Sequence, residues 1–343
     1  MENQTTVSVG SARLLSQTTD RWKLFGTREM QALAKVESSL LAGARKYIQG
    51  QGFIEINTPH ITKATGSCEN IFTVFPLDYF GKRSYLSQTG QLYLEVLTPS
   101  LKKVWTTIHS FRAEPDVDSR HLTEFPLIEI EFEGDFEQLL RHTESIIGSM
   151  VQNVAIERKE ELELFGIGKE HIAKFMPPYK RLTYTKAIEM LNAEGMAIKF
   201  GDDIKSVHEK VLSKALGYEP FFLTHWPEEI KFFNMRRNDD DAKLVNSSDL
   251  ILPFAGEAVG GAEREYRYEI LKEKLERSKM YELLKEAGVE ESDFNWFLEF
   301  YKNNKTSLHS GCGIGFNRVT QSLLKLEDIR ACTVFPQNRE ISW

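Results

Sequence analysis

The sequence is poor in cysteine, in long apolar runs and in excess positive charge. Its three cysteines, Cys68, Cys312 and Cys332, lie far apart and form no CxxC pair, which excludes a disulfide framework and a zinc site of that kind. The longest apolar stretches fall well short of the ~18 residues that a membrane-spanning helix needs. Acidic residues number 50 and basic residues 43, so the net charge is −7. That balance argues against a protein held to nucleic acid mainly by a basic surface.

What is present is the composition of a globular protein from a reducing compartment. Hydrophobic residues make up 41% and charged residues 27% of the 343 positions, enough to bury a sizeable core. The first residues contain neither an apolar signal core nor an Arg-rich amphipathic pattern. We therefore expect a polar leader over residues 1–20, a cytoplasmic location and no membrane partner.

Hydrophobic periodicity predicts helices and grouped strands. Apolar residues recur at helical spacing from about 27 to 49, and glycines end that helix before the strand-like FIEINTP. QLYLEVLTPSLK is typical of a helix, and KVWTTIHSFRAE and FPLIEIEFEG of two strands joined by a charged loop. The fold class is therefore α+β, with a mainly antiparallel sheet flanked by helices. We expect one domain over 21–343 with a helical insert around 155–215.

Three segments carry residues that suit nucleotide chemistry. In the first, Arg112 and Glu114 precede a loop that leads to Arg120, His121 and Phe125. An arginine on a strand can clamp a phosphate, and a loop with arginine and histidine can cover outer phosphates. Phe125 can stack on a purine, and Glu114 can accept from an adenine amino group. Taken alone, the segment also fits a solvated charged hairpin loop.

The second segment runs from Asp249 and Glu257 to the pair Gly260-Gly261 and to Arg264. Two carboxylates on neighbouring strands suit magnesium, which prefers oxygen ligands and bridges nucleotide phosphates. Paired glycines let a ligand approach the backbone closely. Arg264, which we expect at the start of a helix, can fork onto a carboxylate or amide oxygen. The alternative is a structural glycine bulge.

The third segment is a glycine-rich strand ending in an arginine, GCGIGFNR, over residues 311–318. Its G-x-G-x-G spacing differs from the dinucleotide fingerprint, which also needs a following βαβ unit. The pattern suits a nucleotide lying flat on a sheet, with Arg318 stacking on it or bonding to its phosphates.

In this order, the segments resemble class II aminoacyl-tRNA synthetases of the aspartyl/asparaginyl branch. The helix ending in GFIEINTP resembles motif 1, FRAE…RHLTEF…IE resembles motif 2, and GCGIGFNR resembles motif 3. DLILPFAGEAVGGAERE and DIRACTVFP extend the resemblance, which covers about 21–339. It implies the class II catalytic fold, with ATP and Mg2+ and an aminoacyl adenylate as the product of the first step.

The resemblance also implies a role for each matching position. It implies that Arg112 and Arg318 are catalytic, and that Asp249 and Glu257 hold the metal. The positions expected to bind ATP are Arg112, Glu114, Arg120, His121, Phe125, Glu257 and Arg318. The positions expected to bind the amino acid are Gln91, Glu95, Glu129 and Arg264.

The segment SQTGQLYLE bears on which amino acid is accepted. Gln91 and Glu95 lie one helical turn apart and so face the same way. Aspartyl members carry a lysine where this chain has Leu94, whereas GQLYLE resembles the asparaginyl members, with Glu95 accepting from a side-chain amide. The AEREY segment is also similar in sequence to a segment of related asparagine synthetases. Core positions in a helix are the alternative for Gln91 and Glu95.

Several features depart from the family pattern. Few residues precede the motif 1 helix, so we expect no anticodon-binding OB-fold domain. A glutamate that reads the substrate's ammonium group is replaced by Gly66 or Ser67, with Glu69 nearby. Asn317 stands where an acidic residue is common, and Gln337 where arginine is usual.

These departures favour an enzyme that activates aspartate or asparagine and transfers it to ammonia or another amine rather than to tRNA. The alternatives are a tRNA ligase that uses acceptor-stem contacts only, and a non-catalytic paralogue that senses an amino acid. Because motif 1 forms the dimer interface in this family, we also expect a homodimer.

Overall fold

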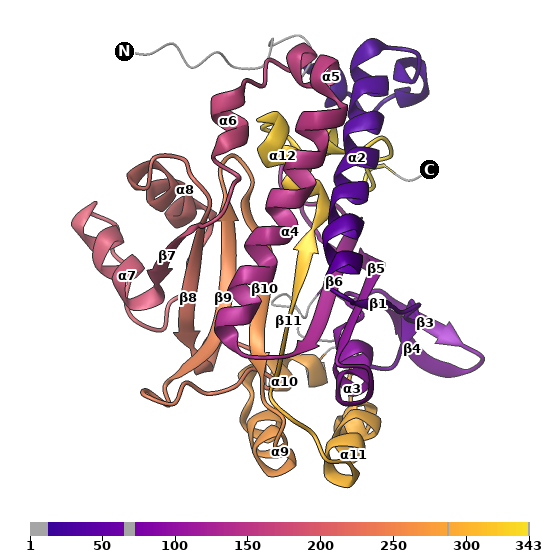
Figure 1. Cartoon of the computed structure of the whole chain (residues 1–343). Coiled ribbons are helices and arrows are strands. Elements are labelled where there is room, and N and C mark those ends of the chain that lie inside the picture. The colour runs from indigo at the N-terminus through magenta and orange to yellow at the C-terminus, as the bar shows by residue number, and fades with distance from the viewer. Residues whose placement is uncertain (1–12, 65–72, 287, 342–343) are drawn as a thin grey trace.

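An eight-stranded sheet forms the centre of the molecule (Figure 1). The computed structural model describes residues 13–64, 73–286 and 288–341. The sheet order is β1-β5-β6-β11-β10-β9-β8-β7, and only the outermost pairs, β1–β5 and β7–β8, are parallel. Its strands are β1 (Ile54–Glu55), β5 (Lys103–Phe111), β6 (Glu124–Glu133), β7 (Lys180–Thr183), β8 (Phe221–Pro227), β9 (Leu244–Leu252), β10 (Gly256–Arg264) and β11 (His309–Gly315). The predicted α+β class is confirmed.

Helices flank this sheet, and a small second sheet projects beside it. The helices are α2 (Arg28–Gly50), α3 (Gln91–Leu101), α4 (Phe136–Glu157), α5 (Lys159–Leu164), α6 (Lys169–Ala173), α7 (Tyr184–Ala193), α8 (Ser206–Ala215), α9 (Tyr268–Arg277), α10 (Lys279–Glu286), α11 (Asn295–Asn303) and α12 (Phe316–Leu324). The second sheet has the order β2-β4-β3, from β2 (Ile61–Thr62), β4 (Lys82–Leu86) and β3 (Pro76–Tyr79). None of the helices in the described part of the chain is long and apolar enough to cross a membrane.

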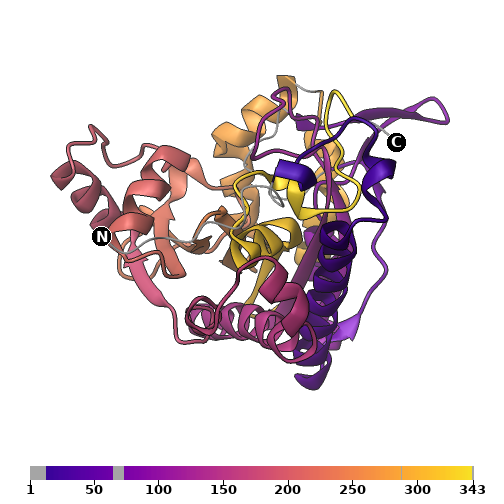
Figure 2. The same cartoon turned by 90° about the horizontal axis from the view of Figure 1, so that it is seen from above.

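The two faces of the central sheet have different functions. The long helices α2 and α4 pack against each other and lie along one face (Figures 1 and 2). Successive side chains of a strand point to opposite faces, so Ile130 and Phe132 of β6 join the core under the helices. Glu129 and Glu131, which alternate with them, point to the opposite face. That face carries the candidate site.

The N-terminal end of the predicted domain differs from expectation. Residues 13–20 were assigned to a polar leader, but Leu15 is fully buried in the main core. The guanidinium of Arg21, also buried, donates to the carbonyl oxygens of Leu15, Gln17 and Val334. This part of the predicted leader is therefore packed onto the domain by apolar burial and by hydrogen bonds.

The region around 155–215 is not wholly helical. Besides α5 to α8 it contains β7, which pairs in parallel with β8 at the edge of the central sheet. After AEREY the chain forms two helices, because α9 ends at Arg277 and α10 follows as a separate helix. Cys312 and Cys332 are both buried free thiols, and Cys68 lies outside the described residues.

Candidate active site

A cavity of about 350 Å³ opens on β6, β11, β10 and β9, on the face of the sheet opposite α2 and α4. It gathers the sequence-predicted site residues from six separate stretches of chain, with one exception, Glu95. Those lining the cavity are Gln91, Arg112, Glu114, Arg120, His121, Phe125, Glu129, Asp249, Glu257, Arg264 and Arg318. Residues far apart in the sequence are therefore neighbours because antiparallel pairing sets these strands side by side.

One end of the cavity is built by the β5–β6 hairpin. The hairpin register continues past β5, because the Arg112 N–H donates to the Thr123 carbonyl at 2.8 Å. The Arg112 guanidinium lies 5.2 Å from the centre of the Phe125 ring, within reach of a cation–π contact. A cation and an aromatic face thus stand together, as a nucleotide site requires.

The loop of that hairpin is held by Asp118, which the sequence analysis missed. Its carboxylate accepts from the backbone N–H groups of Arg120 and His121 at 2.7 and 2.9 Å and faces His121 Nδ1 at 2.9 Å. Burial opposes ionisation of this carboxyl, but these hydrogen bonds outweigh it and lower the pKa of Asp118. The loop conformation therefore depends on a charged Asp118.

Arg318 ties motif 3 to the same loop. Its guanidinium donates to the carbonyl oxygens of Ala255 at 2.5 Å and Arg120 at 2.8 Å. Burial and then the charge of Arg120 lower the pKa of Arg318 to about 10, so it stays protonated at neutral pH. The predicted catalytic pair of Arg112 and Arg318 therefore lies in one cavity, on neighbouring elements.

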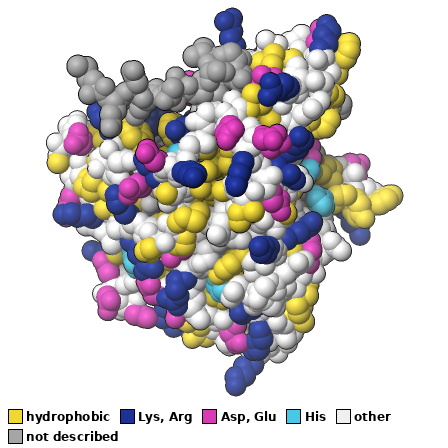
Figure 3. Space-filling view, turned by 45° about the horizontal axis from the view of Figure 1, so that its top comes forward, with side chains coloured by type: hydrophobic (Ala, Val, Ile, Leu, Met, Phe, Trp, Pro, Cys, Tyr) yellow, Lys and Arg dark blue, Asp and Glu magenta, His cyan; other side chains and the backbone are white. Residues whose placement is uncertain are grey.

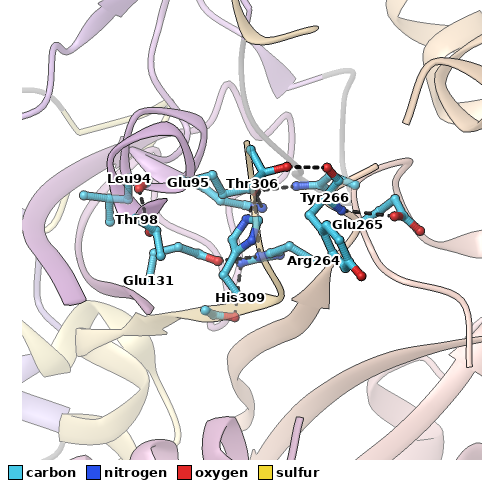
Figure 4. Close-up of polar contacts among 12 residues, drawn as sticks. Leu94, Glu95, Thr98, Glu131, Arg264, Glu265, Tyr266, Thr306 and His309 are labelled. Carbon is cyan, nitrogen blue, oxygen red and sulfur yellow. Dashed lines mark hydrogen bonds and ion pairs between the residues drawn. The ribbon is translucent and has the colours of Figure 1, made fainter. Parts of the chain in front are cut away.

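The floor of the cavity is a buried ion pair between Arg264 and Glu131 (Figure 4). Arg264 donates through Nε and Nη2 to the two Glu131 oxygens at 3.0 and 3.2 Å, and through Nη2 to the Gly311 carbonyl at 3.1 Å. A Cβ at Gly311 would lie 1.8 Å from Glu131 Oε2, so only glycine fits there. Burial raises the pKa of Glu131 to about 7 despite Arg264.

Arg264 does not begin a helix, as the sequence analysis expected. It is the last residue of β10, and the chain then turns because the Glu265 carboxylate accepts from the N–H groups of Tyr266 and Arg267 at 3.1 and 3.0 Å. α9 starts only at Tyr268. The strand position is what points the guanidinium into the cavity floor.

Glu95 lies behind the cavity rather than in its wall. Its side chain is fully buried, and Oε1 accepts from Gln91 Nε2 at 2.6 Å and from Asn234 Nδ2 at 2.8 Å. Oε2 accepts from the Tyr301 hydroxyl at 3.3 Å and lies 3.6 Å from His309 Nε2. The expectation that Gln91 and Glu95 face the same way is confirmed by their hydrogen bond. The expectation that Glu95 is open to a substrate amide is not met in this structure, because protein donors surround it.

Glu95 and His309 stabilise each other's charged forms. Burial opposes ionisation of Glu95, but the hydrogen bond from His309 and the charge of Arg264 lower its pKa. Burial also opposes protonation of His309, yet the hydrogen bond and charge of Glu95 raise its pKa. Glu95 and His309 thus lie side by side behind the cavity.

Glu129 closes the cavity against the start of α3. It accepts from the Thr89 hydroxyl and from the Gly90 N–H, the latter at 2.7 Å. A carboxylate at a helix N-terminus is favoured by the helix dipole and by unpaired N–H groups. Burial nevertheless raises the pKa of Glu129. Glu129 therefore both caps α3 and faces the cavity.

The predicted metal carboxylates lie on adjacent strands around Gly260. A Cβ at Gly260 would lie 3.4 Å from Glu257 Oε1 and 4.0 Å from Asp249 Oδ1. No cluster of three or more His, Cys, Asp or Glu side chains occurs in the described part of the chain. Two carboxylates fit Mg2+ that completes its shell with water and substrate phosphates.

Besides the expected metal, Asp249 has a partner in the protein that was not predicted from the sequence. The buried Lys231 ammonium lies 3.0 and 3.4 Å from its two oxygens and 4.2 Å from the centre of the Trp226 ring. Lys231 also lines the cavity. Asp249 would therefore share its charge between this lysine and a metal.

The structure locates some of the residues that depart from the family pattern. Gly66, Ser67 and Glu69 lie outside the described residues. Asn317 lines the cavity and donates to the Cys332 carbonyl at 3.0 Å and to Glu37 at 3.5 Å. Gln337 contacts the end of the β5–β6 loop, because its backbone carbonyl accepts from the Thr123 N–H at 2.9 Å.

One of the missed residues had a signal in the strand pattern of the sequence. Glu131 follows Glu129 by two positions in a strand, so alternation places both on the same face. Lys231 and Tyr301 come from segments without a recognisable motif, and only the fold brings them to the site.

The fold and the cavity together define a class of protein. A mainly antiparallel sheet with helices behind it carries one phosphate-type arginine on a hairpin and another on the helix that follows the glycine strand, as in class II synthetase catalytic domains. Comparison with known proteins agrees: residues 16–339 match the family model described as "tRNA synthetases class II (D, K and N)".

The chain belongs to this class II tRNA synthetase family and is an ATP-dependent ligase. An asparagine–tRNA ligase of Pyrococcus abyssi is 36% identical over 311 residues, which are 90% of this chain and 69% of that protein. An aspartate–tRNA(Asp/Asn) ligase of Sulfurisphaera tokodaii is 31% identical over 314 residues, 91% of this chain and 70% of that protein. The crystal structure of asparaginyl-tRNA synthetase from Pyrococcus horikoshii complexed with asparaginyl-adenylate matches with a TM-score of 0.86 at 33% identity, covering 94% of this chain and 72% of that one.

Proposed function

We propose that this chain activates asparagine or aspartate with ATP and transfers the aminoacyl group to ammonia or another amine that is not tRNA. One observation carries the proposal: a single cavity joins a cationic, aromatic end at Arg112, Phe125 and Arg318 to a floor closed by Arg264. The first end suits a nucleotide and its phosphates, and the second suits a small amino acid.

The chemistry is two displacements. A carboxylate oxygen of the amino acid attacks the α-phosphorus of ATP, forming an O–P bond while the bond to pyrophosphate breaks. The amine nitrogen then attacks the carbonyl carbon of the adenylate, AMP leaves, and the nitrogen loses a proton to water. Arg112 and Arg318 offset the charge of the phosphates and align them, which is the main requirement of such a reaction.

The proposal includes Mg2+ bound by Glu257 together with Asp249. An ion held there would offset the charge of the nucleotide phosphates. The fit rests on the two carboxylates that border Gly260.

The proposed acceptor rests on electrostatics. A protein that binds tRNA must offset many phosphate charges, but this chain has a net charge of −7. Acidic and basic side chains are also interspersed over the face seen in Figure 3, without a broad basic region. The printed names of the relatives, asparagine–tRNA ligase and aspartate–tRNA(Asp/Asn) ligase, favour a tRNA ligase as the second candidate.

The test is ATP–pyrophosphate exchange without tRNA, first with aspartate and asparagine and then with all other amino acids. Exchange with aspartate makes ammonia the first acceptor to add, and exchange with asparagine excludes simple asparagine synthesis. The Arg112→Ala variant is the control, with exchange expected to fall about 10²–10³-fold because a phosphate donor is lost. Exchange at the wild-type rate in folded Arg112→Ala contradicts the site.

Adding acceptors distinguishes the two candidates. Product formed with ammonia or hydroxylamine, but no aminoacylation of total tRNA, supports the proposed amine transfer. Aminoacylation of tRNA supports the second candidate instead. Absence of exchange with every amino acid contradicts both and favours a non-catalytic paralogue.

A further inference from the structure

Glu209 of α8 reaches the cavity from outside the three motifs. α8 packs against β9 and β10 at one side of the central sheet (Figure 1), and Glu209 lines the cavity while only 6% exposed. Its Oε2 accepts from Arg120 Nη2 at 3.2 Å. It also accepts from the backbone N–H of Glu257. Two donors from different elements thus hold this carboxylate.

The backbone is shaped to admit that carboxylate. A Cβ at Gly256 would lie 2.4 Å from Glu209 Oε2 and 3.1 Å from Arg120 Nη2, and Gly256 has a φ of +77°. A side chain there would both clash with the ion pair and strain the backbone. Burial raises the pKa of Glu209, while Arg120 opposes that rise. The pair is a built contact rather than a chance meeting of surface charges.

Arg120 keeps most of its hydrogen-bonding capacity beyond this pair. A guanidinium has five N–H donors, and within the described residues the Arg120 side chain donates only to Glu209. Its backbone carbonyl accepts from Arg318 at 2.8 Å. Backbone and side chain of this loop residue are therefore held separately, from α12 and from α8.

We propose that Glu209 is the positioning residue for Arg120: it holds one edge of the guanidinium so that the other edge meets the outer phosphates of ATP, or pyrophosphate. The inference rests on the proposed function and extends it to a residue between motifs 2 and 3. A free arginine side chain loses rotamer freedom when it is fixed. Glu209 makes that loss part of folding, so binding of the phosphates is spared it.

The test is calorimetric binding of MgATP, pyrophosphate and AMP to the full chain without amino acid. Glu209→Ala is expected to weaken MgATP and pyrophosphate about tenfold and to leave AMP unchanged, since AMP has no outer phosphate. Glu209→Gln keeps an oxygen acceptor for Arg120 and is expected to restore most of the affinity. Arg120→Ala is expected to show the same defect, and the double variant no further loss.

Glu219→Ala is the matched control. This carboxylate follows α8 in the chain and pairs at 2.7 Å with Lys180, which does not line the cavity, so no change in binding is expected. Unchanged or tighter MgATP binding in Glu209→Ala overturns the inference, as does an equal loss of AMP affinity, which indicates a merely structural role. If the wild type binds neither MgATP nor pyrophosphate, that result contradicts the proposed function itself.

Discussion

At the scale of the residue, Arg264 is compensated before any substrate arrives. Both Glu131 oxygens accept from it, and Glu95 Oε1 lies 3.7 Å from its Nε. Two buried carboxyl groups therefore face its charge, and His309 lies 3.6 Å from one of them, Glu95. A floor of this kind offers little net positive charge to a substrate carboxylate and suits a neutral carboxamide better.

Glu131→Gln tests this electrostatic argument. The substitution keeps an oxygen for Arg264 but removes the negative charge that Glu131 carries above its pKa of about 7, so above that pH the acceptance of aspartate relative to asparagine is expected to rise about tenfold or more. The ratio of exchange rates for the two amino acids measures it. Glu133→Gln is the control: this carboxylate lies on the same strand but pairs with Lys102 at the surface. An unchanged ratio in Glu131→Gln contradicts the argument.

At the scale of the element, the sheet is positioned by close contact of α2 with α4. A Cβ at Gly43 of α2 would lie 2.6 Å from the Ser149 carbonyl and 2.7 Å from the Met150 Cα of α4. Ser149 Oγ also donates to the Gly43 carbonyl at 2.8 Å. The motif 1 helix can lie this close only because one residue has no side chain.

Gly43→Ala is therefore expected to destabilise the protein by about 1–3 kcal/mol through overpacking. Alanine's better helix propensity, ~1 kcal/mol, acts in the opposite direction. Urea unfolding measures the difference. Gly26→Ala is the control, because no atom lies within 4 Å of its Cβ position. Stabilisation by Gly43→Ala would show that α2 and α4 pack less closely.

A second element-scale contact depends on pH. Buried His171 of α6 bonds through Nε2 to the Ser322 carbonyl of α12 at 3.0 Å, and burial lowers the pKa of His171 to about 4. Between its unfolded value of about 6.5 and this folded value, the unfolded chain binds the proton and the folded chain does not. Its contribution to stability is therefore present above pH 6.5 and is lost as pH falls towards 4, by about 2–3 kcal/mol.

His171→Gln keeps a donor for Ser322 but does not titrate. We expect its free energy of unfolding, measured in urea from pH 7 to pH 4, to fall less steeply than that of the wild type. Equal slopes for the two proteins would mean that His171 is protonated as readily in the fold as in the unfolded chain.

At the scale of the whole molecule, one end of the central sheet is open. β1 is an edge strand, and Ile54 on it is 46% exposed. An unpaired edge with an exposed apolar side chain favours pairing with another chain. Because motif 1 comprises α2 and β1, we expect a homodimer across this edge.

Light scattering at micromolar concentration tests the dimer. Ile54→Asp is expected to shift the equilibrium towards monomer, because it places a charge on the edge. Phe80→Asp, at the tip of the β3–β4 hairpin where Phe80 is 90% exposed, is the matched control and is expected to leave the dimer intact. A stable wild-type monomer contradicts the expectation.

Motif chemistry and periodicity were sufficient to predict the main elements and residues of the site. Alternation and turn signals predicted the β5–β6 hairpin with Arg112 and Phe125, and the glycine strand β11, because local patterns of period two survive folding. That strand ends at Gly315, however, and Arg318 lies in the first turn of α12 rather than at the strand end. The reach of Glu209 into the cavity and the lysine against Asp249 had no such signal. Both depend on which helix or loop packs beside which strand.

The sequence by itself determined the class of fold, the family and most of the residues that line one cavity, since these follow from local pattern and motif. The tertiary structure alone decided that Glu95 is enclosed by donors, that Arg264 is compensated by Glu131, and that Leu15 belongs to the core. Burial and ion pairing are properties of contacts between distant segments, and no single segment of the sequence contains them.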